Sequence, residues 1–183
     1  YTDRDNYDYV YDAESLRSLA GRKMHSKKNH FNGFVKEYQD RFVYKAIEKS
    51  EFEECLRLSD KWAFSREKDR NLIGENLAIK KVLKNADKFS CLKIGGIYID
   101  NDLEAFTFGD LINSQMAVIH IEKANPDIRG IYSAVNKLFL ENEFPDVEFV
   151  NREDDLGIEG LRKAKLSYKP LRLVEKYTLT ERQ

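Results

Sequence analysis

The sequence predicts a mixed α/β (α+β) fold in which helices flank one central sheet. A chain of 183 residues is long enough for one sizeable hydrophobic core and short enough that one domain is the default expectation. Some stretches place apolar residues at helical spacing, others alternate them at period two, and the two patterns are interleaved along the chain. With 42% hydrophobic and 34% charged residues, the composition is that of a soluble globular protein.

The first half of the chain is predicted to be mainly helical. Tyr1 to Glu14 alternates aromatic and acidic residues and is either a short strand or an ordered lead-in segment. A helical stripe follows up to Asp40, with a break expected near Gly21 or Gly33. The remaining elements are a strand over residues 41–47, a helix from the Ser50–Glu53 capping box to about residue 62, and a helix over residues 67–86.

The second half alternates strands with helices. Residues 91–99 form either two strands that turn at the paired glycines or one bent strand with a bulge. We then expect a strand over 103–108, a loop over 109–115, a strand over 116–122 and an amphipathic helix over 130–143. A buried strand over 147–150, a helix that ends before Pro170 and a final strand over 171–179 complete the prediction.

The predicted N-terminal helix carries the strongest concentration of positive charge in the chain. No acidic residue lies between Arg22 and Asn32, although the formal net charge of the protein is −1. An anionic partner must therefore meet a local basic patch, because no global field attracts it. This face is either a solvated surface or a contact for phosphates or another anion. Its residues are Arg22, Lys23, His25, Lys27, Lys28 and Asn29.

Two further stretches hold candidate reactive groups. On the strand over 116–122, strict alternation places Val118, His120 and Glu122 on one face. This pattern is either the solvated side of an edge strand or a general base with an orienting carboxylate. Free N–H groups around Gly130 would form an anion-accepting helix end.

The stretch from Asn151 to Pro170 combines Arg, Glu, Asp, Lys and Tyr residues within twenty positions. Asp154 or Asp155 is expected to cap the N-terminus of the helix in this stretch, since a carboxylate there accepts hydrogen bonds from the free N–H groups and interacts favourably with the helix dipole. Ile158 and Leu161 are expected to share the inward face. If this stretch is only a capped surface helix, its density of charged residues is unexplained. We therefore treat it as a further candidate site.

Other classes of site have little support in the sequence. Cys55 and Cys91 have no neighbours at metal-ligand spacing, so we expect buried, reduced thiols in a cytoplasmic protein and no metal site. No apolar run approaches the length needed to cross a membrane.

The order of the elements is that of the GNAT (N-acetyltransferase-like) fold. In addition, four runs resemble the phosphatidylglycerol lysyltransferase C-terminal-like family: Leu19–Asn32, His120–Ala124, Arg129–Gly130 and Asn151–Pro170. The resemblance implies a GNAT-like domain over residues 41–183, preceded by a lead-in and basic helix over 1–40. Together they would form one compact unit, the C-terminal half of a longer protein with an additional N-terminal domain. In that fold the strands before and after the Gly130 helix splay apart to admit an acyl donor.

The resemblance also implies an activity: transfer of an aminoacyl group from aminoacyl-tRNA to a lipid head group or amine acceptor, in the cytoplasm or at the membrane periphery. His120 or Glu122 would be the base, Glu153 and Asp155 would bind a cationic aminoacyl group, and Tyr168 would protonate the leaving oxygen. Donor phosphate would lie at Arg129, Gly130 and Ile131. The basic helix, extended by Arg152, Arg162 and Lys165, would hold transfer RNA or an anionic acceptor.

Two alternatives remain at this point. The domain is an acetyl-CoA or acyl-CoA-dependent N-acetyltransferase, or it is a non-catalytic module that binds RNA or another anion. The expected donor loop, residues 127–133, has one glycine where acetyl-CoA binders have a glycine-richer run. This difference favours a bulkier aminoacyl donor over coenzyme A.

Overall fold

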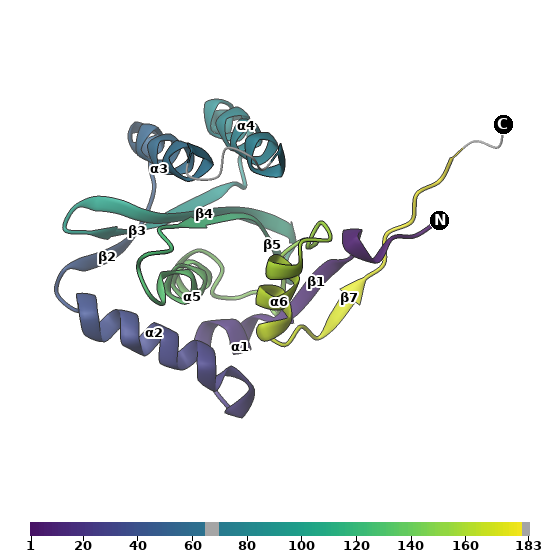
Figure 1. The fold of residues 1–183 in the computed structure, drawn as a ribbon, viewed down its shortest axis with the longest axis horizontal. Helices are drawn as coiled ribbons and strands as arrows, with labels where there is room; N and C mark the ends of the chain where they lie inside the picture. The colour runs from purple at the N-terminus through teal and green to yellow at the C-terminus, as the bar shows by residue number, and fades with distance from the viewer. Residues whose placement is uncertain (65–69, 181–183) are drawn as a thin grey trace.

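The computed structural model describes residues 1–64 and 70–180, with the side chains of residues 62–64 and 70–73 left out of the description. Its centre is a seven-stranded sheet in the order β2-β3-β4-β5-β6-β1-β7 (Figure 1). Every neighbouring pair is antiparallel except β5 and β6, which are parallel. The strands are β1 (Asp8–Asp12), β2 (Phe42–Ala46), β3 (Lys93–Ile99), β4 (Asp102–Asn113), β5 (Met116–Ala124), β6 (Phe149–Asn151) and β7 (Arg172–Val174).

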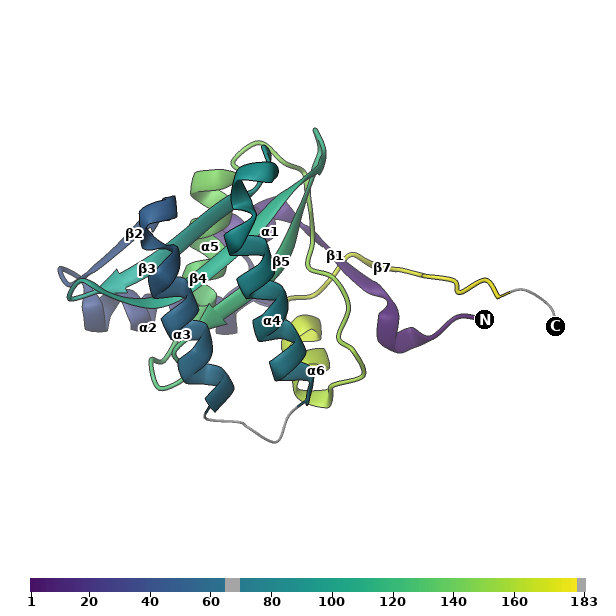
Figure 2. The same cartoon turned by 90° about the horizontal axis from the view of Figure 1, so that it is seen from above.

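Helices cover both faces of the sheet. Helices α3 and α4 pack together on one face, and α5 lies on the other face with α1 and α2 packed against it (Figures 1 and 2). The helices are α1 (Ala13–Ser18), α2 (His25–Tyr38), α3 (Phe52–Phe64), α4 (Arg70–Lys84), α5 (Ile131–Glu143) and α6 (Glu159–Ser167). Short 3-10 turns occupy Arg4–Asn6, Arg22–Met24, Lys49–Glu51 and Ala86–Lys88.

The N-terminal segment is an integral part of this sheet. Strand β1 lies between β6 and β7, and its Tyr9, Val10 and Tyr11 are buried. The helical stripe that follows is broken at Gly21, where φ is +82°, so α1 and α2 are separate helices. Gly33, the other expected break, lies inside α2. Tyr9 and Tyr11 pack in one cluster with Phe139 and Leu140 of α5, and this burial stabilises the N-terminal segment on the sheet.

Strands β5 and β6 separate after three residue pairs. Met116, Ala117 and Val118 pair with residues 149–151, and β5 then continues to Ala124 beyond the last pair. Helix α5 follows β5 and packs on one face of the sheet, in contact with β3, β4 and β5. The splayed strands that the resemblance implies are therefore present.

A β-bulge changes the direction of side chains on β5. Phe108 is opposite Ile121 but the next residue of β4, Gly109, is opposite Ile119, so His120 is an extra residue in β5. The expectation that Val118, His120 and Glu122 share a face is wrong for this reason. Ile119 packs in the cluster on the α5 side, whereas Ile121 packs against the cluster of α3 and α4.

Several predicted element boundaries need correction. Residues 109–115 are mostly strand, because β4 runs to Asn113 and leaves only a tight turn before β5. The expected capping box of Ser50 and Glu53 is wrong: the reciprocal hydrogen bonds join Glu48 and Glu51, two residues earlier.

The C-terminal elements are shorter than predicted. Helix α6 begins at Glu159 after Ile158, with no side-chain cap, so neither Asp154 nor Asp155 caps it. It has no buried residue, and Ile158 is 37% exposed. The predicted strand over 171–179 is limited to β7, with one further bridge between Thr2 and Tyr177. Within residues 1–64 and 70–180, no helix has the length and apolar character needed to cross a bilayer.

Candidate functional site

His120 lies at the point where β5 leaves β6, between two carboxylates. Its Nδ1 is 2.8 Å from Glu153 Oε1, and its Nε2 is 3.5 Å from Asp110 Oδ2. The three side chains come from β5, from the residues after β6 and from β4. About a third of each side chain is exposed, so the group is accessible to a substrate.

The backbone after β6 is held in the conformation that brings Glu153 to His120. Glu153 has a φ of +54°, a left-handed conformation that is unfavourable for a residue with a side chain. Its N–H donates to Asn151 Oδ1 at 2.7 Å, and its carbonyl accepts from Tyr9 N at 3.1 Å. Strand β1 thus fixes the chain that has separated from β5, and the strained residue aims its carboxylate at His120.

The two carboxylates favour the charged form of His120. The hydrogen bond from Nδ1 to Glu153 raises the pKa of His120 above its ordinary value of 6.5, although burial opposes the shift. An ionised Glu153 can only accept, so Nδ1 carries the proton in this pair. Nε2, with the longer contact, is the nitrogen available for proton exchange.

Glu122 faces away from His120 and pairs with Arg152. Arg152 donates from Nε and Nη2 to Glu122 Oε2 at 3.0 and 2.5 Å, and both side chains are 12% exposed. The Arg152 guanidinium carbon also lies 4.6 Å from the ring centroid of Tyr168 and 5.6 Å from that of Tyr11. The expected His120–Glu122 pair is therefore wrong, because the bulge directs the two side chains to different layers.

Asp155 belongs to a third group. Its fully buried carboxylate accepts from Arg162 at 2.8 and 2.7 Å, from Gly157 N at 3.0 Å, and from the Tyr9 hydroxyl. The Arg162 hydrogen bonds hold the pKa of Asp155 well below its usual range. Since its oxygens are already engaged, Asp155 and Arg162 stabilise the turn before α6 rather than face the His120 group.

The beginning of α5 is covered by α2. At Gly130, where φ is +85°, an added Cβ would lie 2.2 Å from the carbonyl oxygen of His30. Arg129 is exposed, but the Ile131 side chain is fully buried in the core. Of the three residues expected to hold donor phosphate, Gly130 thus lies against the α2 backbone, Ile131 is in the core and Arg129 alone is exposed.

The basic residues of α2 and the turn before it face two ways. Arg22, Lys23, His25, Lys28 and Asn29 are exposed, whereas Lys27 is half-buried. The Lys27 ammonium lies 4.0 Å from the centroid of the Tyr168 ring. Lys165 of α6 donates to the carbonyl oxygens of Arg152 and Glu153. Burial lowers the pKa of both lysines to about 8.

Sequence reasoning missed Asp110 and Tyr9. Asp110 lies in β4, in a stretch that the sequence predicts to be a loop, and residues 110–113 do not alternate apolar and polar side chains, so no local pattern indicates the strand. The role of Tyr9 depends on the position of β1 beside β6, which no local pattern reveals.

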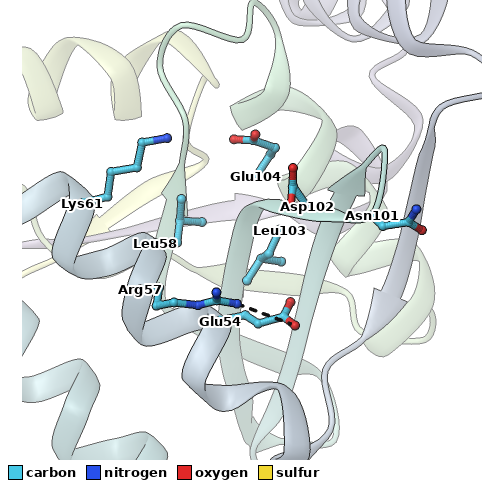
Figure 3. A pocket seen from close by; sticks show the side chains of 8 residues that line it. All are labelled: Glu54, Arg57, Leu58, Lys61, Asn101, Asp102, Leu103 and Glu104. Carbon is cyan, nitrogen blue, oxygen red and sulfur yellow. Dashed lines mark ion pairs between the residues drawn. The ribbon is translucent and has the colours of Figure 1, made fainter.

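A separate hollow lies between α3 and the turn into β4 (Figure 3). Acidic and basic side chains are mixed around it, and Glu54 and Arg57 approach to 4.0 Å. None of the sequence-predicted site residues lines it. Its lining residues are Glu54, Arg57, Leu58, Lys61, Asn101, Asp102, Leu103 and Glu104. Elsewhere, no cluster of three or more His, Cys, Asp and Glu residues suited to a metal ion occurs in the described part of the chain.

The parted parallel strands and the helix that follows β5 define the class of the protein: a domain with the GNAT-like fold. Residues 1–180 match the family described as phosphatidylglycerol lysyltransferase, C-terminal, and the chain belongs to this family.

Three relatives illustrate the similarity. The chain is 36% identical to a conserved protein of unknown function from Bacteroides thetaiotaomicron whose crystal structure superposes with a TM-score of 0.90, over 96% of this chain and 59% of that one. L-PGS from Bacillus licheniformis shares the fold at 14% identity and a TM-score of 0.65, over 96% and 60%. An uncharacterised protein of Mycoplasmoides gallisepticum is 23% identical over 92% of this chain and 54% of its own. The chain thus spans between 54% and 60% of the length of these relatives.

Proposed function

We propose that this domain transfers an aminoacyl group from aminoacyl-tRNA to a lipid head group or an amine acceptor. The observation that carries the proposal is the His120 bulge at the end of the β5–β6 pairing, with carboxylates at both ring nitrogens. Membership of the phosphatidylglycerol lysyltransferase C-terminal family supports this choice, and lysine is the first aminoacyl group to test.

In the proposed reaction His120 serves as the base. Nε2 takes the proton from the attacking hydroxyl or amine, which bonds to the ester carbonyl carbon, and the carbon–oxygen bond to the RNA breaks. The imidazolium then returns this proton to the leaving oxygen. Glu153 orients the ring through Nδ1 and stabilises its positive charge. Asp110, on the open side, would bind the ammonium group of the aminoacyl donor.

This mechanism reassigns several residues. Glu122 and Asp155 are already paired with arginines, so His120 is the base and Asp110 replaces Asp155 as the acidic partner of the donor. Tyr168 contacts Lys27 and Arg152, which suits a binding role better than protonation of the leaving oxygen. The exposed residues Arg22, Lys23, His25, Lys28 and Asn29 would contact RNA.

The same geometry favours an aminoacyl donor over acetyl-CoA. Where the β5 and β6 main chains separate, two side-chain pairs connect them, His120 with Glu153 and Glu122 with Arg152. An extended thioester arm between the strands would have to break both pairs. The packing of α2 against Gly130 further restricts the helix end at which its phosphates would bind.

The test is a transfer assay with labelled lysyl-tRNA and phosphatidylglycerol vesicles, in which label in the lipid fraction is measured. Replacing His120 by Gln should reduce the rate by roughly 100-fold or more, since general base catalysis contributes at least that factor. The melting temperature should change little because the side chain is one-third exposed. An active H120Q variant would refute the role of His120. Turnover with labelled acetyl-CoA alone would support an N-acetyltransferase, and RNA binding without turnover would support a non-catalytic module.

A further inference from the structure

The layer below the β5–β6 opening contains donors and acceptors without partners. Arg152 uses Nε and Nη2 for Glu122, but its buried Nη1 has no hydrogen-bond partner. Glu122 Oε1 is likewise buried and without a partner. The Lys27 ammonium lies over the Tyr168 ring and pairs with no carboxylate among the described residues. Unpaired buried polar groups are rare in folded proteins, so their concentration here requires an explanation.

The charges in this layer do not balance. Besides burial, the charge of Arg152 lowers the pKa of both Lys27 and Lys165, and Glu122 acts on all three cations in the opposite direction. Lys165 donates to main-chain carbonyls, and Asp154 and Glu153 also act on it. Of these carboxylates, Glu122 alone acts on Arg152 and Lys27, so one carboxylate faces two cations and leaves a local excess of positive charge that an anion would neutralise.

We propose that Lys27, Arg152 and Tyr168 form a binding site for a phosphate group that carries a hydroxyl donor. A phosphate oxygen would accept from Arg152 Nη1, a buried donor without a partner, and from the Lys27 ammonium, which lies over the Tyr168 ring. A P–OH or neighbouring hydroxyl would donate to Glu122 Oε1, the acceptor that lacks a donor. Ser133 and Tyr168, whose hydroxyl oxygens are 3.4 Å apart, would provide the adjoining polar wall.

The site differs from the exposed basic surface of α2. Arg152 is 12% exposed at its side chain and Tyr168 is 6% exposed, so a compact group suits this site. An RNA backbone presents its phosphates as a continuous chain and suits the exposed residues better. The phosphate can come from a free phosphorylated molecule or from a lipid head group, and this second source rests on the proposed function.

Binding is tested by calorimetry and thermal shift with inorganic phosphate at pH 6.5, where phosphate retains a hydroxyl. Sulfate at equal ionic strength is the matched anion without a hydroxyl donor. Lys27→Met removes the unpaired ammonium, and Lys36→Met removes an exposed charge from the same helix. We expect saturable phosphate binding that is weaker for sulfate, reduced at least 10-fold in K27M and unchanged in K36M.

Vesicles distinguish the two sources. Binding to phosphatidylglycerol but not phosphatidylcholine vesicles, lost in K27M and inhibited by inorganic phosphate, would assign the site to a lipid head group. Phosphate binding without such vesicle binding would assign it to a free phosphate compound. Absence of phosphate binding, equal affinity in K27M, or K27M-sensitive binding of RNA alone would overturn the proposal. No donor substrate is present, so failure of the transfer reaction would leave this result unaffected.

Discussion

Replacing Glu153 by Gln should lower the pKa of His120 while leaving the fold intact. The amide keeps the size of the carboxylate but removes the charge at 2.8 Å from Nδ1. A charge-assisted hydrogen bond contributes roughly 1.5–3 kcal/mol when it is shielded from water. Because His120 and Glu153 are 33% and 43% exposed, screening reduces this to about 1 kcal/mol. A change of about 1 kcal/mol corresponds to a roughly fivefold decrease in the ratio of charged to neutral His120, and the pKa of His120 falls accordingly.

The assay is an NMR titration of the three histidine rings, with the His120 signal assigned by its loss in H120Q. In the wild type His120 should titrate above 6.5, and His30 below it, because burial and the nearby Lys27 and Arg129 lower the pKa of His30. Asp154→Asn is the matched control, since Asp154 is adjacent in sequence but pairs with Lys176. A His120 pKa below 6.5, or one that E153Q and D154N shift equally, would refute the geometry.

The same pair contributes to stability in a pH-dependent way. The pKa of His120 is higher in the folded than in the unfolded protein, so its contribution is fully present below about pH 6.5. It is lost as the pH rises through the folded pKa. The difference in free energy of unfolding between wild type and E153Q, measured in urea, should therefore decrease as the pH rises through that range.

Three further predictions concern the frame of the site. Gly130→Ala should destabilise the protein by about 2–4 kcal/mol, because a residue in the left-handed region gains a Cβ against the His30 carbonyl. The melting temperature should then fall by about 5–10 °C. An unchanged melting temperature would mean that α2 does not pack against Gly130. Asp155→Asn should cost about 1.5–3 kcal/mol at pH 7, since the buried side chain loses the charge that accepts hydrogen bonds from Arg162 and the Tyr9 hydroxyl. This loss should shrink below about pH 3.9, where the unfolded carboxyl is protonated, and equal losses at pH 3 and 7 would contradict the depressed pKa. Exposed Cys91 should react with a thiol reagent in the native protein and buried Cys55 only after unfolding; two thiols reacting at one rate would contradict this packing.

Hydrophobic periodicity predicted most of the helices and strands, because it records which faces are buried. Their order and the family resemblance then implied the fold and the parting of β5 from β6. They did not predict the bulge at His120. A bulge is a mismatch between two strands, and the sequence of β5 alone is compatible with strict alternation. One extra residue therefore separated His120 from Glu122, which the alternating pattern had placed together.

The carboxylate partners of His120 were only half predicted. Glu153 was identified as a site residue, but its contact with His120 depends on the left-handed backbone that β1 holds in place. Asp110 was missed because its strand continues past Gly109. Asp155 was predicted for the site from its position in the acidic turn, yet Arg162 and Tyr9 engage it instead. Residue type and position identified the cluster of polar groups, and long-range pairing decided which of them face one another.

The most direct test of the account is the pH dependence of a single turnover with lysyl-tRNA, compared with the titration of His120 in the same protein. We predict that the rate rises with pH through the His120 pKa, and that E153Q moves this rise to lower pH by the same amount as the NMR titration. If E153Q leaves the pH at which the rate rises unchanged, or if H120Q shows the same pH-dependent rise, His120 is not the base at the opening between β5 and β6.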